Sequence, residues 1–510
     1  MSSVAIGNNL SAAQPDAPRA AWGALLGIAA AVSLAHLLTN GRYGFHRDEL
    51  QFLSDASHLD WGYVAYPPLT PVLERISLGI FGLSMVGLRL FSVLAQAVAL
   101  IVTGLMARDL GGGRGAQILA VGAVALSPVP LFQGTEFQYS SFDYLWWVLV
   151  AFFTIRLLRT DNPHWWLAIG ATIGVALETK YTVCFIVAGL LFGVATCGAR
   201  RWFASKWFWA GVALAVVIFL PNLLWQIRHD FITYHFLQFI HARDVRLGRG
   251  EKFWFKQFFV CANIWSAPLW IAGVWMFLRS ARFRPLGWMF LVPAAYFTLA
   301  HAVFYYLSPA YPMAIAMGAA GMEKLLGWLP RVWSIPTGTV LTVGMLSAGA
   351  YGIAVVLPIS NGGPLKDFAL TSNDALREEI GWPELVSTVA AIRDSLPPDQ
   401  RAQAGIIVGN YGEQGAIEML GPAYHLPAPI SLTNSAWLRG YPTPQPTTLI
   451  VVGVSHEDAN QIFSGCRLAG HNGNSEGVKN EESQYHPDIF VCASPRLPWP
   501  QFWVKYQSFG

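Results

Sequence analysis

Long apolar runs constrain the fold of this 510-residue chain more than any other feature of its sequence. Because the hydrocarbon core of a membrane is about 30 Å thick, a helix needs roughly 20 mostly apolar residues to cross it. Runs of that length predict about eleven membrane-spanning helices. They are expected near residues 21–39, 85–106, 116–133, 142–158, 165–178, 181–197, 207–225, 259–278, 286–302, 305–322 and 333–357.

The composition agrees with a membrane protein. Hydrophobic residues make up 54% of the chain and charged residues only 12%, against roughly one quarter charged in soluble domains. The formal net charge of +3 indicates no nucleic-acid partner. The first apolar run is long enough to span, and a single basic residue, Arg19, precedes it. It is therefore predicted to stay as the first helix, behind a cytoplasmic tail of residues 1–20, and not to be a cleaved signal peptide.

Basic residues occur at every second junction between the apolar runs, and such junctions face the cytoplasm as a rule. These residues are Arg108, Arg114, Arg156, Arg159, Arg200, Arg201, Lys206, Arg279, Arg282, Arg284, Lys324 and Arg331. The intervening junctions, predicted to lie outside, are residues 40–84, 134–141, 178–181, 226–258 and 302–305, together with the C-terminal tail. The loop 226–258 is itself basic and aromatic, so an amphipathic segment on the outer surface is expected there.

The composition changes after about residue 360, where Pro, Asp, Glu, Asn and Gly become frequent. Residues 366–510 are expected to form a small α/β domain outside the membrane, beyond a membrane domain of residues 21–358. Its predicted elements are amphipathic helices at 383–396 and 456–464 and buried strands at 404–409 and 448–454. Cys466 and Cys492 are the only cysteine pair in this part. A disulfide between them or two free thiols are both compatible with the sequence.

The first outer loop, residues 40–84, carries the most informative polar residues. Asp48 and Glu49 follow a membrane helix closely, and acids near lipid are costly unless they are solvated, paired or used. A carboxylate can accept the proton of a hydroxyl or amine nucleophile during group transfer, so Asp48 and Glu49 are candidate catalytic residues. The alternative is that both acids cap a helix in the loop, with Arg47 as their partner.

A second pair of acids, Glu136 and Asp143, lies near the next outer junction. Two acidic segments on the same side of the membrane can face one cavity, which makes both residues candidate supporting acids. Asp143 could equally be the N-cap of the following helix, a common use of Asp.

A lipid-linked phosphate donor would place its phosphate at the outer interface, where cationic or hydroxyl groups must meet its charge. Candidates are Lys180, Arg228, His301 and Tyr306. A simpler structural role is also possible for these residues. Lys180 could reach up to the headgroups, Arg228 could pair within its own loop, and His301 could end a helix. Arg89, inside the second apolar run, is interpreted as a tether between helices.

These residues resemble bacterial members of glycosyltransferase family 39, which are related to dolichyl-phosphate-mannose protein mannosyltransferases and to lipid A aminoarabinose transferases. The resemblance spans nearly the whole chain. It is carried by Phe45-His-Arg-Asp-Glu49, Trp61-Gly-Tyr63, Pro67-Pro-Leu69, Thr179-Lys-Tyr-Thr182, Tyr305-Tyr-Leu-Ser-Pro-Ala-Tyr-Pro312, Gly409-Asn-Tyr-Gly-Glu413, Gly415-Ala416, Asn434-Ser435 and Trp437-Leu438. One departure is Tyr66, where the aminoarabinose branch tends to have a lysine before the proline pair.

The resemblance implies a GT-C fold: a mainly α-helical membrane bundle with an outer loop bearing the catalytic acid and an appended outer domain. It implies an inverting displacement with Asp48 as base, Glu49 and Glu136 as supporting acids, and Lys180 and Tyr306 as donor-phosphate contacts. The implied donor is a polyprenyl-phosphate sugar and the acceptor a lipid, glycan or protein. No cofactor is firmly implied, although a divalent cation could assist. The implied location is the bacterial inner membrane, with the active site and the C-terminal domain on the periplasmic side.

Two other functions compete with this interpretation. A transporter or flippase for a lipid-linked substrate usually shows two related halves and helices interrupted at mid-membrane, and neither is evident in the sequence. A membrane-anchored scaffold would leave the acidic first loop and Lys180 unexplained. Replacing Asp48 by Asn separates these possibilities, because only a transferase that uses this base would lose sugar transfer.

Overall fold

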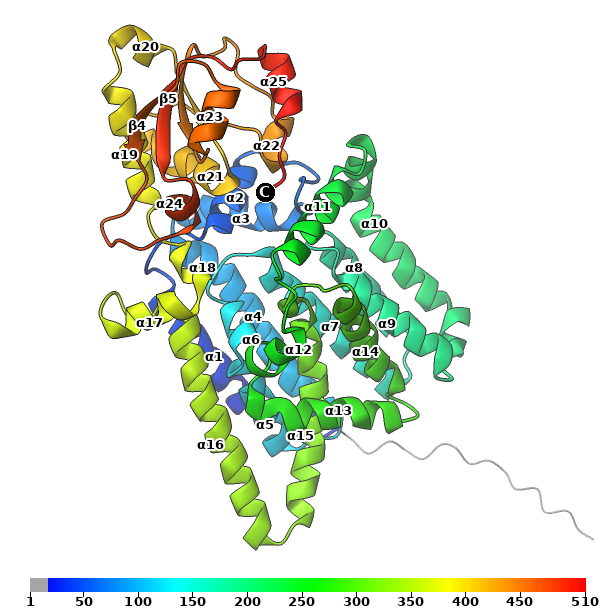
Figure 1. Cartoon of the computed structure of the whole chain (residues 1–510). Coiled ribbons are helices and arrows are strands. Elements are labelled where there is room, and N and C mark those ends of the chain that lie inside the picture. The colour runs from blue at the N-terminus through cyan, green and yellow to red at the C-terminus, as the bar shows by residue number, and fades with distance from the viewer. Residues whose placement is uncertain (1–16) are drawn as a thin grey trace, which may run out of the picture.

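The structure is a computed structural model that describes residues 17–510, so most of the predicted tail of residues 1–20 lies outside the described residues. A helical body carries a smaller α/β domain at one end, and the hairpin of α15 and α16 extends farthest in the opposite direction (Figure 1). The helices of the body that coincide with the predicted apolar runs are α1 (Trp22–Thr39), α4 (Met85–Asp109), α5 (Arg114–Ala125), α6 (Pro128–Phe132), α7 (Tyr139–Thr160), α8 (Trp165–Leu177), α9 (Val183–Thr196), α10 (Lys206–Arg228), α13 (Ala267–Arg279), α14 (Arg284–Leu299), α15 (Tyr311–Trp328) and α16 (Arg331–Val356).

Within residues 17–510, five helices are long and apolar enough to cross a membrane, namely α1, α4, α7, α10 and α16. The shorter apolar helices include α5, α8 and α9. The fold class is confirmed as a mainly helical membrane bundle with a small C-terminal sheet domain, whereas the number of eleven spans stays a prediction.

Two predicted spans are broken in the structure. In the run at 116–133, α5 ends at Ala125 and α6 begins at Pro128, whose ring disfavours helical backbone in the preceding residue. In the run at 259–278, the helical segments Phe253–Cys261 and Ile264–Arg279 meet at an angle of 96°. Asn263 holds this bend, because its side-chain amide donates to the carbonyl oxygens of Leu126 at 3.1 Å and Met345 at 3.0 Å.

The predicted outer loop of residues 40–84 contains two helices, α2 (Arg47–Ser57) and α3 (Leu69–Phe81). A capping interaction starts α2, since the Glu49 carboxylate accepts the backbone N–H of His46 at 2.8 Å. The loop 226–258 likewise contains α11 (Ile232–Arg246) and the short α12 (Phe253–Lys256). Both outer segments are therefore ordered into helices.

The C-terminal domain is a five-stranded sheet flanked by helices. Its strands are β1 (Ala404–Val408), β2 (Pro429–Ser431), β3 (Thr448–Val452), β4 (Arg467–His471) and β5 (Asp488–Cys492), in the order β2-β1-β3-β5-β4. β1 runs parallel to β2 and β3, whereas β5 runs antiparallel to β3 and β4. The helices of this region are α17 (Pro364–Ser372), α18 (Asp374–Arg377), α19 (Trp382–Asp394), α20 (Pro398–Ala402), α21 (Tyr411–Leu420), α22 (Asn434–Leu438), α23 (His456–Ile462), α24 (Glu481–Tyr485) and α25 (Trp499–Lys505).

The buried strands predicted at 404–409 and 448–454 correspond to β1 and β3, and the helices predicted at 383–396 and 456–464 correspond to α19 and α23. The question left open about the cysteines is answered by a disulfide between Cys466 and Cys492. It joins the end of β5 to the residue before β4.

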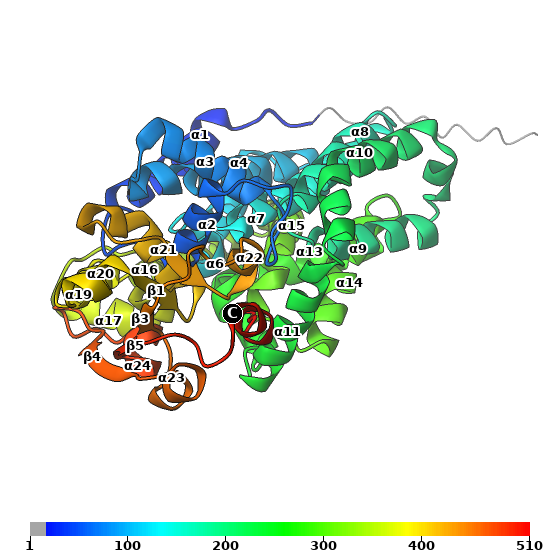
Figure 2. The same ribbon diagram turned by 90° about the horizontal axis from the view of Figure 1, so that it is seen from above.

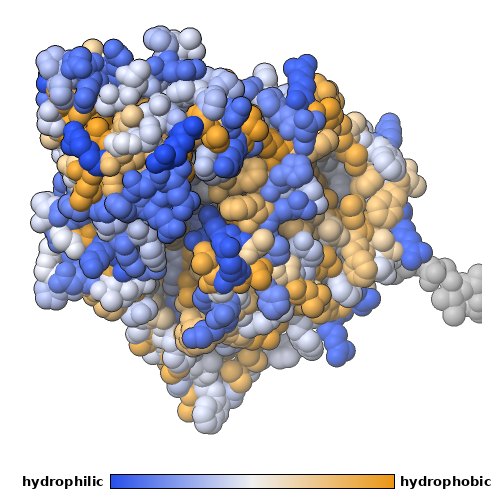
Figure 3. Space-filling view, turned by 45° about the horizontal axis from the view of Figure 1, so that its top comes forward, coloured by the Kyte–Doolittle hydropathy of each residue, from blue (hydrophilic) through white to orange (hydrophobic). Residues whose placement is uncertain are grey.

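The C-terminal domain rests on the first outer segment, because α21 packs against α2 (Figure 2). Gly415 permits the close approach, since a Cβ atom there would lie 2.1 Å from the carbonyl oxygen of Leu50. Polar side chains add to this contact: Gln414 Nε2 donates to Ser54 Oγ at 2.9 Å, and Arg439 pairs with Asp55. Hydrophilic side chains gather over the C-terminal domain, and apolar ones over the helices beside it (Figure 3).

Candidate active site

Asp48 is the accessible acid of the predicted pair. It lies in the first turn of α2, and its side chain is 30% exposed. One carboxylate oxygen accepts the Tyr411 hydroxyl at 2.9 Å, and the other accepts Gln138 Nε2 at 3.2 Å. These donors come from α21 and from the outer junction before α7, so three distant segments converge on this carboxylate.

Glu49 has the opposite surroundings. Its side chain is fully buried, and it accepts hydrogen bonds from Arg89 Nε at 2.8 Å, Arg89 Nη2 at 2.7 Å and the backbone N–H of Phe137 at 2.8 Å. With the bond from His46, both carboxylate oxygens are occupied. Glu49 is therefore positioned to anchor α2 to the body, and Asp48 alone of the pair faces outward.

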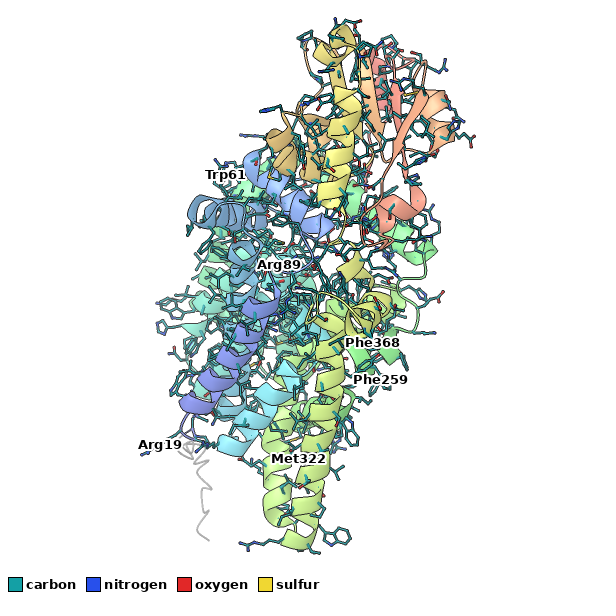
Figure 4. The ribbon with its side chains drawn as sticks, turned by 90° about the vertical axis from the view of Figure 1, so that its left-hand side faces the viewer. Arg19, Trp61, Arg89, Phe259, Met322 and Phe368 are labelled. Atoms are coloured by element: carbon teal, nitrogen blue, oxygen red, sulfur yellow. A yellow bond between two sulfur atoms is a disulfide. The ribbon has the colours of Figure 1, made fainter. Side chains whose placement is uncertain are left out.

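Arg89 is confirmed as a tether between helices. Besides Glu49, its guanidinium donates to the carbonyl oxygens of Asn40 at 3.0 Å and Gly44 at 2.8 Å, and it lies 3.5 Å from Glu379 ahead of α19. Figure 4 shows Arg89 at the level between the helical body and the C-terminal domain. Burial raises the pKa of Glu379 to about 8, although Arg89 opposes the shift. The contacts of Arg89 therefore join α4, α2 and the C-terminal region.

Glu136 lies beside Asp48, because Gln138 Nε2 donates to both carboxylates and reaches Glu136 at 2.6 Å. Burial, reinforced by Glu379 and Glu49, raises the pKa of Glu136 well above its usual range. His46 Nδ1 is 3.7 Å from Glu136 and accepts the backbone N–H of Asp48 at 3.2 Å. Burial lowers the pKa of His46, so its ring is neutral. Glu136 thus favours the protonated form in this setting.

Lys180 lies among three tyrosine rings at the junction between α8 and α9. Its Nζ is 4.5 Å from the ring centre of Tyr139, 4.7 Å from that of Tyr306 and 5.4 Å from that of Tyr305. Such faces attract a cation. Burial lowers the pKa of Lys180 to about 8, while the carboxylates of Asp143 and Asp48 act in the opposite direction. Lys180 is therefore half-buried, and the negative charges of Asp143 and Asp48 stabilise its ammonium form.

Asp143 does not start its helix, so the N-cap alternative is wrong. α7 begins at Tyr139 with Gln138 as its N-cap residue, which places Asp143 in the second turn. Its carboxylate accepts the Thr182 hydroxyl at 2.7 Å. Asp143 thus joins α7 to the segment that carries Lys180.

Arg228 and His301 are not brought into contact with Asp48 or Lys180. Arg228 lines a separate groove of about 400 Å³ with Asp60, Trp61 and Trp225. His301 is exposed beyond α14, with a positive φ of 49°. The structure thus assembles Asp48, Glu136, Asp143, Lys180 and Tyr306 and leaves Arg228 and His301 outside the cluster.

Tyr411 was not among the predicted site residues. It follows Asn410, which caps α21 because its side chain accepts the backbone N–H of Glu413 at 2.9 Å. The next residue, Tyr411, reaches Asp48 and lies under the Arg47 guanidinium, 4.8 Å from its ring centre. The sequence feature that could have indicated Tyr411 is its position just after the predicted buried strand at 404–409.

Gln138, Tyr139 and Tyr305 were also missed as site residues. Each lies within three residues of a predicted one, in an outer junction or at its edge. Within residues 17–510, no group of three or more His, Cys, Asp or Glu side chains is arranged to hold a metal ion, so the possible divalent cation stays an untested prediction.

The assembled groups have complementary chemical roles. An accessible carboxylate can accept a proton, and a half-buried ammonium beside three phenol rings can meet the charge of a phosphate. The carboxylate charge of Asp48 also acts on the ammonium of Lys180.

Comparisons with known proteins agree with this chemistry. Residues 65–225 match the family described as dolichyl-phosphate-mannose-protein mannosyltransferase. The lipid A galacturonosyltransferase RgtD of Rhizobium johnstonii is 28% identical over 363 residues, 68% of this chain and 72% of that protein. An undecaprenyl phosphate-alpha-4-amino-4-deoxy-L-arabinose arabinosyl transferase of Pseudomonas fluorescens is 24% identical over 277 residues, 50% of this chain and 47% of that protein.

Solved structures share the fold. ArnT from Cupriavidus metallidurans, in a crystal structure bound to undecaprenyl phosphate, aligns with a TM-score of 0.55 at 15% identity over 92% of this chain and 98% of that one. A variant of the arabinofuranosyltransferase AftD from Mycobacteria aligns with a TM-score of 0.52 at 16% identity over 94% of this chain and 42% of that one. None of these relatives is named as a transporter. The resemblance seen in the sequence is confirmed: the chain is similar to membrane glycosyltransferases, it shares the GT-C fold of the solved structures, and its apolar helices support a multi-pass membrane protein.

Proposed function

We propose that this glycosyltransferase moves a sugar from a polyprenyl-phosphate carrier to an acceptor on the non-cytoplasmic side of the membrane, with Asp48 as general base. The observation that carries the proposal is the presence of an accessible carboxylate, Asp48, together with a half-buried ammonium, Lys180, held among three tyrosine rings. Asp48 faces outward at the start of α2, and Lys180 lies within its electrostatic reach. Both the proton acceptor and the phosphate partner of such a transfer are present.

The reaction follows from these two groups. The acceptor hydroxyl or amine attacks the anomeric carbon of the donor sugar and gives its proton to Asp48. As the new bond forms, the bond from that carbon to the phosphate oxygen breaks, and its electron pair leaves with the lipid phosphate. Lys180 and Tyr306 stabilise the departing phosphate charge. A single displacement of this kind inverts the anomeric configuration.

The names of the relatives support the donor and acceptor classes. One relative is named for an undecaprenyl-phosphate-linked sugar, one solved structure holds undecaprenyl phosphate, and another relative is named for its action on lipid A. We therefore propose an undecaprenyl-phosphate sugar as donor and a lipid-linked glycan as acceptor. Tyr66 is buried at the position where the aminoarabinose branch tends to have a lysine, and its hydroxyl bonds Asp55, so donor phosphate contact falls to Lys180.

Two observations support the outward orientation of the site. The junctions rich in arginine and lysine lie at the ends of helices remote from α2 and α21, and such junctions face the cytoplasm. The disulfide between Cys466 and Cys492 lies in the C-terminal domain, and disulfides persist in oxidising compartments. Both observations support our proposal that α2 and the C-terminal domain lie on the periplasmic side.

The decisive experiment incubates the purified protein with a panel of undecaprenyl-phosphate sugars and follows which donor is consumed. Asp48→Asn should consume none while it purifies normally. Asp60→Asn is the matched control, because Asp60 lies in the same outer segment and bonds Trp225 instead of the site residues. Unchanged transfer by Asp48→Asn would refute the base assignment. A chelator in the same assay tests whether a divalent cation contributes.

A further inference from the structure

A second group of charged side chains lies at the opposite end of the helical body from the C-terminal domain. Figure 4 shows Arg19 there, where α1 begins. An open pocket of about 640 Å³ is formed by residues 17–20, the first residue of α1 and the last turns of α4 and α7. Its lining includes four arginines: Arg19, Arg108, Arg156 and Arg159. The proposed transfer reaction uses none of them.

Three of these arginines are held by one carboxylate. Asp109 accepts Arg108 Nη2 at 2.7 Å and Arg159 Nη1 at 2.9 Å, and it also pairs with Arg156. The Asp109 side chain is fully buried, whereas those of Arg108, Arg156 and Arg159 are 17%, 23% and 18% exposed. Arg156 also lies over the rings of Phe152 and Trp165. The guanidinium groups are therefore fixed in place and partly shielded from water.

The positive charge of this pocket exceeds the negative charge around it. Four guanidinium groups face one carboxylate, and the C-termini of α4 and α7 each contribute about half a negative charge. Asp161, just beyond α7, pairs with Arg201 instead. An excess of about two positive charges remains, and a single carboxylate cannot engage all the N–H donors of three guanidinium groups. Partly buried charge without a partner is unfavourable, so the pocket favours an anion.

The wall of the pocket is held in place and continues into an apolar surface. The buried Gln117 of α5 accepts the backbone N–H of Ala21 at 2.8 Å and donates to the carbonyl oxygen of Arg19 at 3.1 Å. On α1, Trp22 and Leu26 are half exposed, one turn apart. A ligand with an anionic head in the pocket would therefore find an apolar track for its tail along α1.

We propose that this pocket binds the phosphate of an anionic phospholipid headgroup, with the acyl chains lying along α1. Guanidinium groups present paired N–H donors that match phosphate oxygens, and basic pockets between membrane helices suit such headgroups. The exposed Leu26 favours a lipid over a free phosphate ion, because the acyl chains of a lipid can pack against this apolar side chain and a phosphate ion cannot. The leaflet follows from the proposed orientation, whereas the binding does not depend on the transfer reaction.

The test measures the thermal unfolding midpoint of the purified full-length protein in a neutral detergent. Short-chain phosphatidylglycerol is titrated, with short-chain phosphatidylcholine, glycerol phosphate and inorganic phosphate in parallel. Phosphatidylglycerol should raise the midpoint in a saturable way, and the other three should not. Arg156→Gln should need about tenfold more phosphatidylglycerol for the same shift, since it loses one charge-assisted contact.

Arg282→Gln is the matched control, because it removes the same charge at another exposed basic junction outside the pocket. It should respond as the wild type does. Sugar transfer by Arg156→Gln establishes that this variant is folded. Equal responses of Arg156→Gln and Arg282→Gln to phosphatidylglycerol would refute binding at this pocket. A full shift of the unfolding midpoint with inorganic phosphate or glycerol phosphate would refute the lipid as the ligand.

Discussion

Asp48 and Glu49 are adjacent in the chain, yet their carboxylates have different surroundings. Asp48 accepts bonds from two side chains and stays partly exposed, whereas Glu49 is enclosed and bound to Arg89. A helix turns by about 100° per residue, so neighbours on its first turn face different directions. At the start of α2, one direction leads to the Asp48 site and the other into the helical body.

Glu49→Gln should destabilise the protein and leave the chemistry of Asp48 in place. The amide keeps the shape of the side chain but deprives the buried guanidinium of Arg89 of the carboxylate that accepts two of its hydrogen bonds. Removing one partner of a buried pair costs roughly 3 to 5 kcal/mol. The thermal unfolding midpoint should fall clearly for Glu49→Gln and stay near that of the wild type for Asp48→Asn. Equal stabilities of the two variants would contradict these separate roles.

Lys180 should give the transfer reaction a basic limb in its pH dependence. Burial lowers the pKa of Lys180 to about 8, so the ammonium is charged below that pH and loses its proton above it. Only the charged form attracts the donor phosphate, so kcat/KM for the donor should fall as the pH rises through about 8. Lys180→Met should lower kcat/KM by about 10²-fold.

Lys180→Arg is the informative control, because arginine stays charged throughout this pH range. Measured from pH 6 to 10, kcat/KM of Lys180→Arg should lack the fall near pH 8 that the wild type shows. The same fall in both proteins would assign the basic limb to another group.

At the scale of elements, the contact between α2 and α21 makes the C-terminal domain part of the site. Tyr411 is the first residue of α21, and its hydroxyl donates to Asp48 at 2.9 Å. The domain therefore contributes to the position of α2 and of its acid.

Tyr411→Phe should lower kcat about tenfold and leave KM for the donor unchanged, because it removes one bond to a charged group and keeps the ring. Tyr424→Phe is the matched control, since Tyr424 is exposed just beyond α21. Equal kcat values of Tyr411→Phe and Tyr424→Phe would remove Tyr411 from the reaction.

Gly415→Val tests the packing of the two helices. A Cβ atom at Gly415 would lie 2.1 Å from the Leu50 carbonyl oxygen, so a side chain must push α21 away from α2. Sugar transfer should fall by more than about tenfold. Gly473→Val, at a surface position with open space around it, should keep wild-type transfer. Comparable activities of the two variants would show that the helices tolerate separation.

At the scale of the whole molecule, the orientation in the membrane decides which compartment the site serves. The C-terminal domain and α2 lie at one end of the helical body, and the arginine pocket lies at the other. The two ends therefore meet opposite leaflets. A lipid-linked donor must have its phosphate in the leaflet next to Asp48 for transfer to occur.

Cysteine labelling measures this orientation in a variant without Cys184, Cys197 and Cys261. A cysteine at the exposed Gly473 of the C-terminal domain should react with a membrane-impermeant maleimide in cells whose outer membrane has been opened. A cysteine at the exposed Ala281, in a basic junction, should react only after the inner membrane is also opened. The reverse labelling pattern would show that the site faces the cytoplasm and would contradict the proposed function.

The sequence by itself determined the membrane body, the change to an α/β domain and the position of Asp48 in a segment between two apolar helices. Hydropathy, composition and strand patterns depend on consecutive residues, so a single chain reveals them. It also indicated the supporting residues Glu136, Asp143, Lys180 and Tyr306, because charged or polar groups at membrane junctions are conspicuous against apolar runs.

The tertiary structure alone decided which of these groups meet. It enclosed Glu49 against Arg89, left Arg228 and His301 outside the cluster, and brought Tyr411 to Asp48. Residues 48 and 411 belong to different domains, and their contact depends on how α21 packs against α2. Burial and hydrogen bonding are set by which elements touch, and no local pattern of residues records that.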